Sequence, residues 1–391
     1  MIFLHLGLTA FGGPVAHLGH FRQAFVVRRQ WLSEAAYADL VALCQFLPGP
    51  ASSQVGMALG LQRAGYAGAA AAWIGFTLPS ALVLVLLALG MTRLDTSHPA
   101  MQGIWHGLAV AATAVVAQAV WGMARTLTPD TPRRAIALLT AGAALCWPGP
   151  WVQIVLITLA GAVGAAGLSS KSLPSAAPES QTPQPHALGL ASFWLLLFAA
   201  LLLGLPLLAS VLAPDGAVAL VDVFYRAGAL VFGGGHVVLP LLQAEVVPTG
   251  WVSQEQFLAG YGAAQAMPGP LFSFAAFLGA ARVPSPTGWV GGGLALLAIF
   301  APAFLLVAGV LPYWARLRQH RRARHILAAV NAAVVGLLLA ALVDPIGTHG
   351  LRSVPDALLA ATALLALTRL TLPPWAVVLA CGAAGAAMAL A

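Results

Sequence analysis

The chain has 391 residues, of which 60% are hydrophobic and only 7% are charged. A soluble domain carries about 25% charged residues, so this composition excludes a soluble globular protein and indicates a multi-pass protein of the lipid bilayer. The net charge of +7 could suggest a nucleic acid partner. The arginines, however, fall in short loops between apolar segments, where the positive-inside rule explains them, so no nucleic acid is expected.

The cysteines and the first residues give no sign of a cofactor or of a cleaved leader. Cys44, Cys146 and Cys381 lie in apolar surroundings without metal-ligand spacing, so neither a disulfide framework nor a metal site is expected. The first residues lack a basic segment followed by a cleavage site, which argues against a signal peptide. The first helix is short, and we expect the native chain to start upstream.

Two short motifs interrupt the apolar segments at the start of the chain. Residues 1–30 read as two helical pieces around Phe11-Gly12-Gly13-Pro14, and residues 34–62 read as two pieces around Pro48-Gly49-Pro50. Glycine frees the φ angle and proline removes a backbone donor, so both motifs break a helix. Within a bilayer, broken backbone is tolerated where it is buried in protein or lines a wet cavity.

The segments that follow have the lengths of membrane helices and of a linker. Residues 66–90 and 101–121 are long enough to span the bilayer, and residues 135–147 and 150–168 predict two short closing helices. Residues 169–190 are rich in Ser and Pro and predict an exposed linker. Residues 191–213 then predict one further span, which has no counterpart in the first part of the chain.

Residues 1–168 and 214–391 are two copies of one unit. Gly12-Gly13 recurs as Gly233-Gly234, 221 positions later, and Pro48-Gly49-Pro50 recurs as Pro268-Gly269-Pro270, 220 positions later. The second copy also contains two predicted spans, at 288–311 and 325–343, that match the spans of the first. The sequence therefore predicts an all-α polytopic membrane protein made of two homologous halves, with helices broken at both motifs.

The loop charges predict that the two halves have opposite orientations. The loop at 22–33 carries three arginines, whereas the matching loop at 241–255 carries two glutamates and no base. The loop at 90–100 has one arginine cancelled by an aspartate, whereas its counterpart at 312–325 holds five arginines. Such opposite bias, together with the extra span, predicts an inverted-topology repeat with the N-terminus and the linker inside.

The broken helices predict an anion site. The N-terminus of a helix presents free N–H groups and a positive dipole end, and two inverted N-termini can face each other across one dianion. Glycine N–H groups at the other breaks, neutral amides and hydroxyl groups add donors, and Arg226 stands ahead of the second glycine break. The predicted substrate-binding residues are Gly12, Gly13, Gln45, Pro48, Gly49, Pro50, Ser52, Ser53, Arg226, Gly233, Gly234, Gly235, Gln265, Pro268, Gly269, Pro270 and Ser273.

Each of these residues also has a purely structural interpretation. The Pro-Gly-Pro triplets can be tight turns between ordinary spans, and Arg226 can form an intrahelical ion pair with Asp222. His17 and His236, which follow the glycine breaks, are candidates for a proton relay near neutral pH, although a buried histidine can equally be a packing residue.

The motifs resemble those of the chromate ion transporter (CHR) family, and in particular its long, two-domain bacterial members. The resemblance rests on residues 11–17, 45–50, 232–236 and 265–270 and covers nearly the whole chain. It implies a secondary active transporter that exports chromate from the cytoplasm across the bacterial inner membrane, driven by the membrane potential or the proton gradient. It also implies chromate resistance and antiparallel halves. No cofactor is expected.

Other functions remain open at this point. Sulfate is a tetrahedral dianion similar to chromate, so a sulfate transporter fits the same motifs. An anion channel would show the same helix breaks but would dissipate gradients. A membrane redox enzyme would need paired haem-binding histidines, such as His17 with His106 or His236 with His325. The sequence also leaves a homodimer open.

Overall fold

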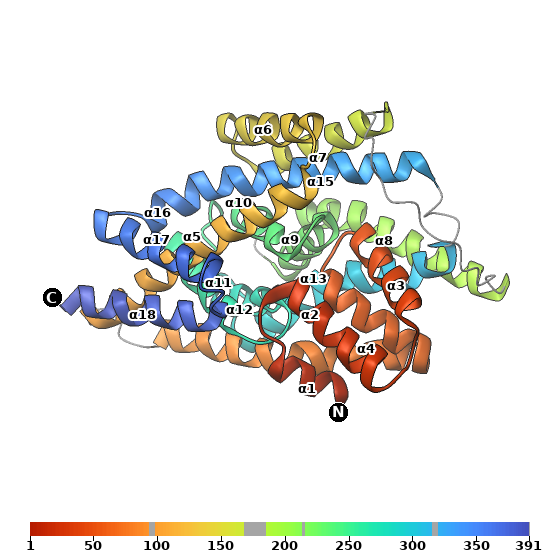
Figure 1. The fold of residues 1–391 in the computed structure, drawn as a ribbon, viewed down its shortest axis with the longest axis horizontal. Helices are drawn as coiled ribbons and strands as arrows, with labels where there is room; N and C mark the ends of the chain where they lie inside the picture. The colour runs from red at the N-terminus through yellow and green to blue at the C-terminus, as the bar shows by residue number, and fades with distance from the viewer. Residues whose placement is uncertain (94–97, 168–184, 213–215, 315–319, 391) are drawn as a thin grey trace.

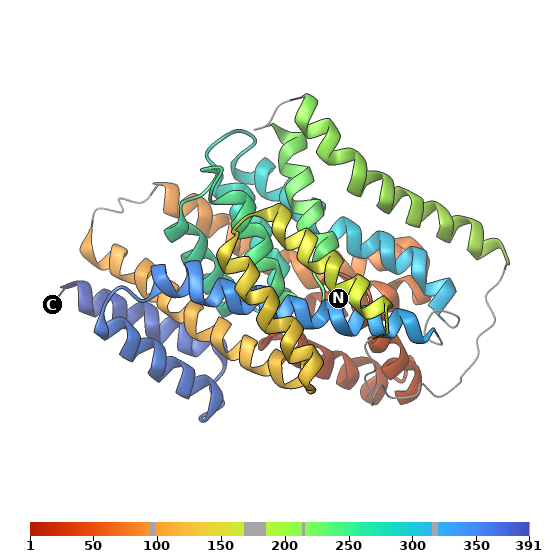
Figure 2. The ribbon, with the colours of Figure 1, turned by 90° about the horizontal axis from the view of Figure 1, so that it is seen from above.

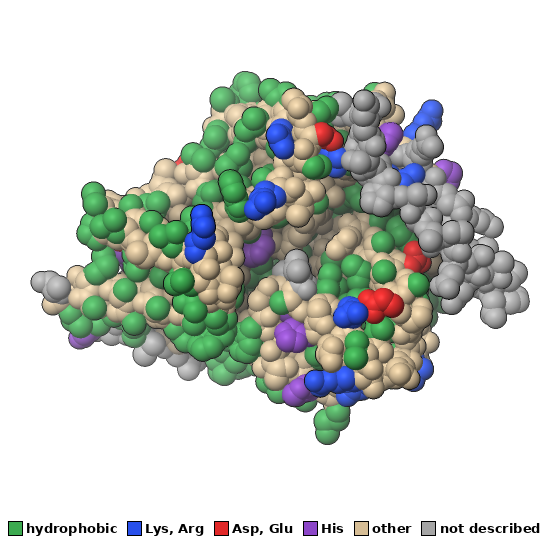
Figure 3. Space-filling model, viewed as in Figure 1, with side chains coloured by type: hydrophobic (Ala, Val, Ile, Leu, Met, Phe, Trp, Pro, Cys, Tyr) green, Lys and Arg blue, Asp and Glu red, His purple; other side chains and the backbone are tan. Residues whose placement is uncertain are grey.

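The computed structural model describes residues 1–93, 98–167, 185–212, 216–314 and 320–390. Within these ranges the chain forms helices and contains no β-strand (Figure 1). Figure 3 shows hydrophobic side chains spread over much of the face in view, with charged side chains scattered among them. Five helices among the described residues are long and apolar enough to cross a membrane, at Ala51–Met91, Pro99–Leu127, Gly189–Val211, Gly288–Tyr313 and Arg322–Gly350. The prediction of an all-α polytopic membrane protein is confirmed.

The first part of the chain begins with short helices and continues with long ones. Ser33 caps the third helix by accepting a hydrogen bond from the backbone N–H of Ala36 at 3.2 Å, and Asp130 caps the sixth by accepting from that of Arg133 at 3.0 Å. The fourth helix is kinked at Ala64 and Gly65, which leave the helical conformation. The elements are α1 (Ile2–Thr9), α2 (Gly13–Phe21), the π-helical η1 (Arg22–Arg28), α3 (Glu34–Phe46), α4 (Ala51–Arg93), α5 (Pro99–Leu127), α6 (Thr131–Cys146) and α7 (Pro150–Ala165).

The last part of the chain shows a similar succession of short and long helices. Ser253 caps α11 and forms a reciprocal capping box with Gln256. The elements are α9 (Ala217–Leu230), η2 (Gly235–Val237), α10 (Val238–Val246), α11 (Gln254–Ala266), η3 (Leu271–Ser273), α12 (Phe274–Ala281), α13 (Gly288–Val310), η4 (Leu311–Tyr313), α15 (Arg321–Ala341), η5 (Leu342–Gly347), α16 (Thr348–Gly350), α17 (Val354–Thr368) and α18 (Pro374–Leu390).

One helix, α8 (Pro185–Val211), lies between these two parts of the chain. It begins at Pro185, so residues 185–190, predicted as the end of the linker, are helical instead; residues 168–184 lie outside the described residues. Very little of its apolar span is buried, and it runs along the edge of the molecule (Figure 2). Such a helix faces lipid along most of its surface, while Phe198 accepts a hydrogen bond from Tyr225 of α9 at 3.0 Å.

The long helices of one part pack against the closing helices of the other part. Helix α5 packs on α17 and α18, while α15 packs on α6 and α7 (Figure 1). Small residues permit the close approach, because a Cβ atom at Gly107 of α5 would lie 2.2 Å from the carbonyl oxygen of Cys381 in α18. Likewise, a Cβ atom at Gly164 of α7 would lie 2.6 Å from that of His325 in α15.

The short helices α11 and α12 form the most deeply buried part of the structure. Phe257 and Tyr261 of α11 are fully buried and pack edge-to-face on Phe274 of α12, with ring centroids 5.2 and 5.7 Å apart. The second triplet, which connects α11 to α12, therefore has its Gly269 and Pro270 buried among packed side chains.

Candidate functional site

Both glycine motifs interrupt the backbone between two helices. Helix α1 ends at Thr9, and Gly12 and Gly13 adopt φ angles of 98° and 74° before α2 continues. Helix α9 ends at Leu230, and Gly233 and Gly234 have φ angles of 76° and 150°. These φ values lie in the region that L-residues with side chains seldom adopt, so glycine is required there.

Both Pro-Gly-Pro triplets form a turn that leads directly into a new helix. Helix α3 ends at Phe46 and α4 begins at Ala51, while α11 ends at Ala266 and η3 begins at Leu271. The central glycines again have positive φ, 121° at Gly49 and 94° at Gly269. Gly49, Pro50, Gly269 and Pro270 are buried, and Pro48 and Pro268 are partly exposed.

Each triplet is hydrogen-bonded to the glycine break of the other half. The backbone N–H of Gly49 donates to the carbonyl oxygen of Val231, next to Phe232, at 2.7 Å. The backbone N–H of Gly269 donates to the carbonyl oxygen of Ala10, next to Phe11, at 3.0 Å. The four motifs that the sequence singles out therefore meet in two crossed pairs.

Hydroxyl groups cluster beside the triplets. Ser273 and Ser80 share a hydrogen bond of 2.7 Å between their Oγ atoms, and both side chains are buried. Ser52 Oγ lies 3.4 Å from Nδ1 of His17, whose Nε2 lies 3.1 Å from the carbonyl oxygen of Ala10. The structure thus connects Ser52, the His17 ring and the glycine break of the first half.

Several buried polar atoms around the triplets have no hydrogen-bond partner in the described structure. They include Oγ of Ser53, Oε1 of Gln54 and Oγ1 of Thr77, in side chains that are 2%, 0% and 1% exposed. Leaving a buried polar group unsatisfied costs about 1–3 kcal/mol, so such groups mark a place where a ligand or ordered water completes the site. Ser53 and Gln54 lie in the first turn of α4, where the helix also presents free N–H groups.

The two predicted glutamines differ in their surroundings. Gln265 Nε2 lies 3.5 Å from Nδ1 of His236, which also forms a 2.7 Å hydrogen bond with the hydroxyl of Tyr261. Gln45, by contrast, is exposed at the end of α3. The side-chain amide that is hydrogen-bonded to the first triplet is that of Gln54, whose Nε2 donates to the carbonyl oxygen of Pro48 at 2.7 Å.

Arg226 is bound by two carboxylates. Its Nη2 lies 2.7 Å from Oδ2 of Asp222, one turn earlier on α9, and its Nη1 lies 2.6 Å from Oε1 of Glu245 on α10. The guanidinium group also lies 5.8 Å from the ring centroid of Trp151. The intrahelical ion pair with Asp222 is present, and a role of Arg226 in attracting the substrate stays a prediction.

A further polar pocket of about 740 Å³ lies where α5, α11 and α17 meet. In it, His106 Nε2 lies 2.8 Å from Oδ1 of Asp356, and the backbone N–H of Arg352 donates to Oδ2 of Asp356 at 3.0 Å. Burial works against the charged carboxylate, but the hydrogen bonds from His106 and Ser353 outweigh it and lower the pKa of Asp356. His106 thus has Asp356 as its partner, whereas His17 contacts Ser52 beside the first triplet.

Sequence reasoning missed several polar residues that lie beside the triplets and the glycine breaks. Ser80, Thr77 and Asn331 come from long helices that the chain brings in from other segments, and only folding places them beside the motifs. Asn331 Oδ1 is buried without a partner, 3.3 Å from where a Cβ atom of Gly233 would lie. Tyr261 was detectable, because it lies four residues before Gln265 on the same helix.

A multi-pass helical fold with broken helices at its centre defines a membrane transport protein. The family model described as Chromate transporter matches residues 1–166 and 218–386, and the chain belongs to this family. It is 30% identical, over 94% of this chain and 88% of the relative, to a protein of Synechococcus elongatus named "Probable chromate transport protein".

Two further relatives carry similar names. A "Chromate transport protein" of Pseudomonas aeruginosa is 29% identical over 88% of this chain and 79% of the relative. A protein with the same name from Cupriavidus metallidurans is 27% identical over 92% of this chain and 84% of the relative. No solved structure matches the chain. The resemblance read from the motifs is confirmed.

Proposed function

We propose that this chain is a secondary active transporter that exports chromate from the cytoplasm across the bacterial inner membrane. The observation that carries the proposal is the set of buried, unpartnered polar atoms at the helix that begins after Pro50. A hydroxyl such as that of Ser53 can donate to an oxyanion, and the free N–H groups and positive dipole end of α4 add to the attraction. Gln54 Oε1, which can only accept, would bond an ordered water or a protonated oxyanion.

The two crossed hydrogen bonds support the further proposal that the halves form an inverted repeat. Gly49 donates to the residue before the second glycine break, and Gly269 donates to the residue before the first. An approximate twofold axis relating the halves would generate both this reciprocity and the exchange in which α5 packs on α18 while α15 packs on α7. The opposite charges of the matched loops then favour an axis in the plane of the membrane. In such a repeat the substrate binds between the halves, and their relative movement exposes it to either side.

Direction and energy coupling form the finer part of the proposal. Export is driven by the membrane potential or the proton gradient, with His17 and His236 as candidates for proton transfer because both lie beside the helix breaks. Counterflow of labelled chromate and sulfate in proteoliposomes, with and without a pH gradient, tests substrate and coupling together. Uptake that dissipates any imposed anion gradient without coupling would favour a channel, and a homodimer would appear in the mass of the purified protein.

Substitution of Ser53 tests the anion site directly. Ser53→Ala removes one hydrogen bond to a charged group, worth about 1.5–3 kcal/mol, and should raise the Kd for chromate by roughly ten-fold to a hundred-fold. Ser53→Asp places a negative charge where the dianion would bind and should abolish binding. Equilibrium binding of radiolabelled chromate to the purified protein measures both effects.

Two serines offer matched controls for these variants. Ser210→Ala, on the lipid-facing helix α8, removes an exposed hydroxyl that donates only locally to Leu207. Ser33→Asp introduces the same charge at a helix cap that aspartate also satisfies. Both should bind chromate like the unaltered protein. If Ser53→Asp binds chromate as tightly as the unaltered protein does, the anion site does not lie at the triplets.

A further inference from the structure

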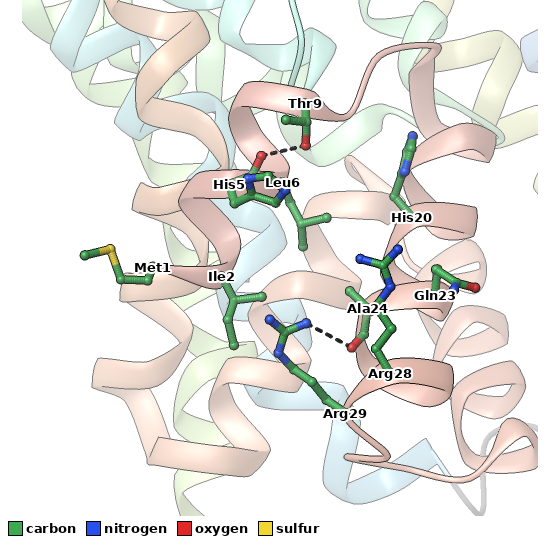
Figure 4. Close-up of a pocket in the computed structure, with 10 residues that line it drawn as sticks. All are labelled: Met1, Ile2, His5, Leu6, Thr9, His20, Gln23, Ala24, Arg28 and Arg29. Carbon is green, nitrogen blue, oxygen red and sulfur yellow. Dashed lines mark hydrogen bonds between the residues drawn. The ribbon is translucent and has the colours of Figure 1, made fainter.

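A second pocket, of about 390 Å³, opens between α1 and the continuous α2–η1 segment (Figure 4). Its lining contains two arginines and two histidines and no acidic side chain, so its electrostatic potential is positive. The lining residues are Met1, Ile2, His5, Leu6, Thr9, His20, Gln23, Ala24, Arg28 and Arg29.

The two sides of this pocket are fixed by packing and by backbone geometry. Phe3 of α1 packs against Phe21 and Phe25 of the facing segment, with ring centroids 6.2 and 5.1 Å apart. Figure 4 shows Arg28, the last residue of η1, and Arg29, which follows it, extending into the space between the helices, where Arg29 Nη1 donates to the carbonyl oxygen of Ala24 at 3.3 Å. The π-helical turns of η1 are rare in proteins and occur often at functional sites.

One residue that lines the pocket is the chain neighbour of a residue at the helix breaks. Thr9, the last residue of α1, lines the pocket, and the next residue is Ala10. The carbonyl oxygen of Ala10 accepts the hydrogen bond from Gly269 and lies 3.1 Å from Nε2 of His17. Thr9 is therefore one residue along the chain from the point where a glycine break and a triplet meet.

We infer that this pocket is a second, low-affinity binding site for oxyanions, through which the dianion is loaded before it reaches the helix breaks. Guanidinium groups pair with tetrahedral oxyanions in bidentate fashion. Arg28 and Arg29 are exposed, so their attraction is weak, long-ranged and sensitive to salt, and serves to raise the local concentration of the anion. The role in loading rests on the proposed export function, because the positive-inside rule then puts these arginines on the cytoplasmic side.

Binding to this pocket is measured with the deeper site disabled. In the Ser53→Asp protein, radiolabelled sulfate should still bind weakly, and binding should fall steeply as the salt concentration rises. Adding Arg28→Gln and Arg29→Gln should remove this residual binding, whereas Arg28→Lys with Arg29→Lys should retain part of it, because the charge remains while the bidentate geometry is lost. Arg125→Gln, which removes an exposed arginine elsewhere, is the control and should change nothing. Residual binding that survives the glutamine pair would overturn the inference.

The phosphate of an anionic lipid has the same chemistry as a free oxyanion, so the lipid is varied as well. The binding measurements are made in nanodiscs of zwitterionic lipid and repeated with added phosphatidylglycerol. Sulfate binding in zwitterionic discs that depends on the two arginines supports the inference. Absence of sulfate binding there, with loss of bound phosphatidylglycerol in the glutamine pair, would assign the pocket to a lipid headgroup instead.

Transport distinguishes a loading site from the transport site itself. With Ser53 intact, the glutamine pair should raise the KM for chromate about five- to ten-fold at low salt, leave the maximal rate unchanged and flatten the dependence of KM on ionic strength. An unchanged KM would refute loading. If the unaltered protein transports no chromate, the proposed function fails, while the binding result in the Ser53→Asp protein still stands or falls by itself.

Discussion

Gly269 combines two restrictions that make glycine necessary at the second triplet. Its φ angle of 94° is unfavourable for any residue with a Cβ atom, and such an atom would lie 3.0 Å from the carbonyl oxygen of Phe76 and 3.1 Å from Oγ of Ser80. Gly250 has a similar φ of 72°, but nothing lies within 4 Å of its Cβ position. The pair therefore separates backbone strain from crowding.

Alanine at these two glycines should have unequal effects on stability. Gly250→Ala should cost about 1–2 kcal/mol through the left-handed conformation alone. Gly269→Ala should cost about 2–5 kcal/mol, because crowding against a packed site adds about 1–3 kcal/mol, and it should also weaken chromate binding. Unfolding of the purified protein by denaturing detergent, together with chromate binding, measures both. Equal losses of stability would mean that the triplet yields to accommodate a side chain.

Some residues of the candidate site were predictable from the sequence, and others were not. The glycines and prolines were predictable as helix breaks, because few residues tolerate these backbone conformations; Ser273 is buried beside its triplet, and its role in binding stays a prediction. At the first triplet, a substrate-binding role of Gln45 stays a prediction, while the amide that is hydrogen-bonded to the triplet is that of Gln54, which donates to Pro48. Helical spacing does not specify which of two amides folds back on a turn. That choice depends on the packing around Gly49, where Ala303 of α13 closes the space.

At the scale of whole helices, the sequence located the elements but not their partners. The predicted span 288–311 corresponds to α13 at Gly288–Val310, because glycine and a change in polarity mark both ends. The predicted span 101–121 is shorter than α5, which runs from Pro99 to Leu127. The exchange of partners between α5 and α18 was not predictable, since hydropathy records that a helix is apolar and not which helix it touches.

The contact between α5 and α18 gives a prediction with an internal control. Gly107 of α5 faces Cys381 of α18, whereas Gly122 of the same helix has open space around its Cβ position. Gly107→Val should force the helices apart and cost about 2–4 kcal/mol, whereas Gly122→Val should change stability by less than about 1 kcal/mol. Thermal unfolding in detergent, followed by tryptophan fluorescence, compares them. Similar stability of the two variants would show that α5 and α18 can move apart at little cost in free energy.

The charge distribution of the whole molecule bears on the orientation of the two halves. Exposed bases gather at Arg22, Arg28 and Arg29, whereas the matching loop of the second half ends in Glu255, which pairs with Arg352 at 2.7 Å. Opposite bias in matched loops is expected when two copies face opposite sides of a membrane. The same inversion would let the two triplets approach one site from opposite directions, so the topology and the anion site are linked in this proposal.

Two histidines at equivalent places give the sharpest test of this topology. His98 and His320 are the exposed residues immediately before α5 and α15, helices that the repeat predicts to be equivalent. With the three native cysteines replaced by alanine, His98→Cys should react with an impermeant maleimide in intact cells. His320→Cys should react only after the cytoplasmic face is exposed in everted vesicles. Chromate binding by both variants verifies that the fold is retained. Reaction of both cysteines from the same side would refute the inverted repeat, because matched loops would then lie on one face and the two helix N-termini after the triplets would point the same way.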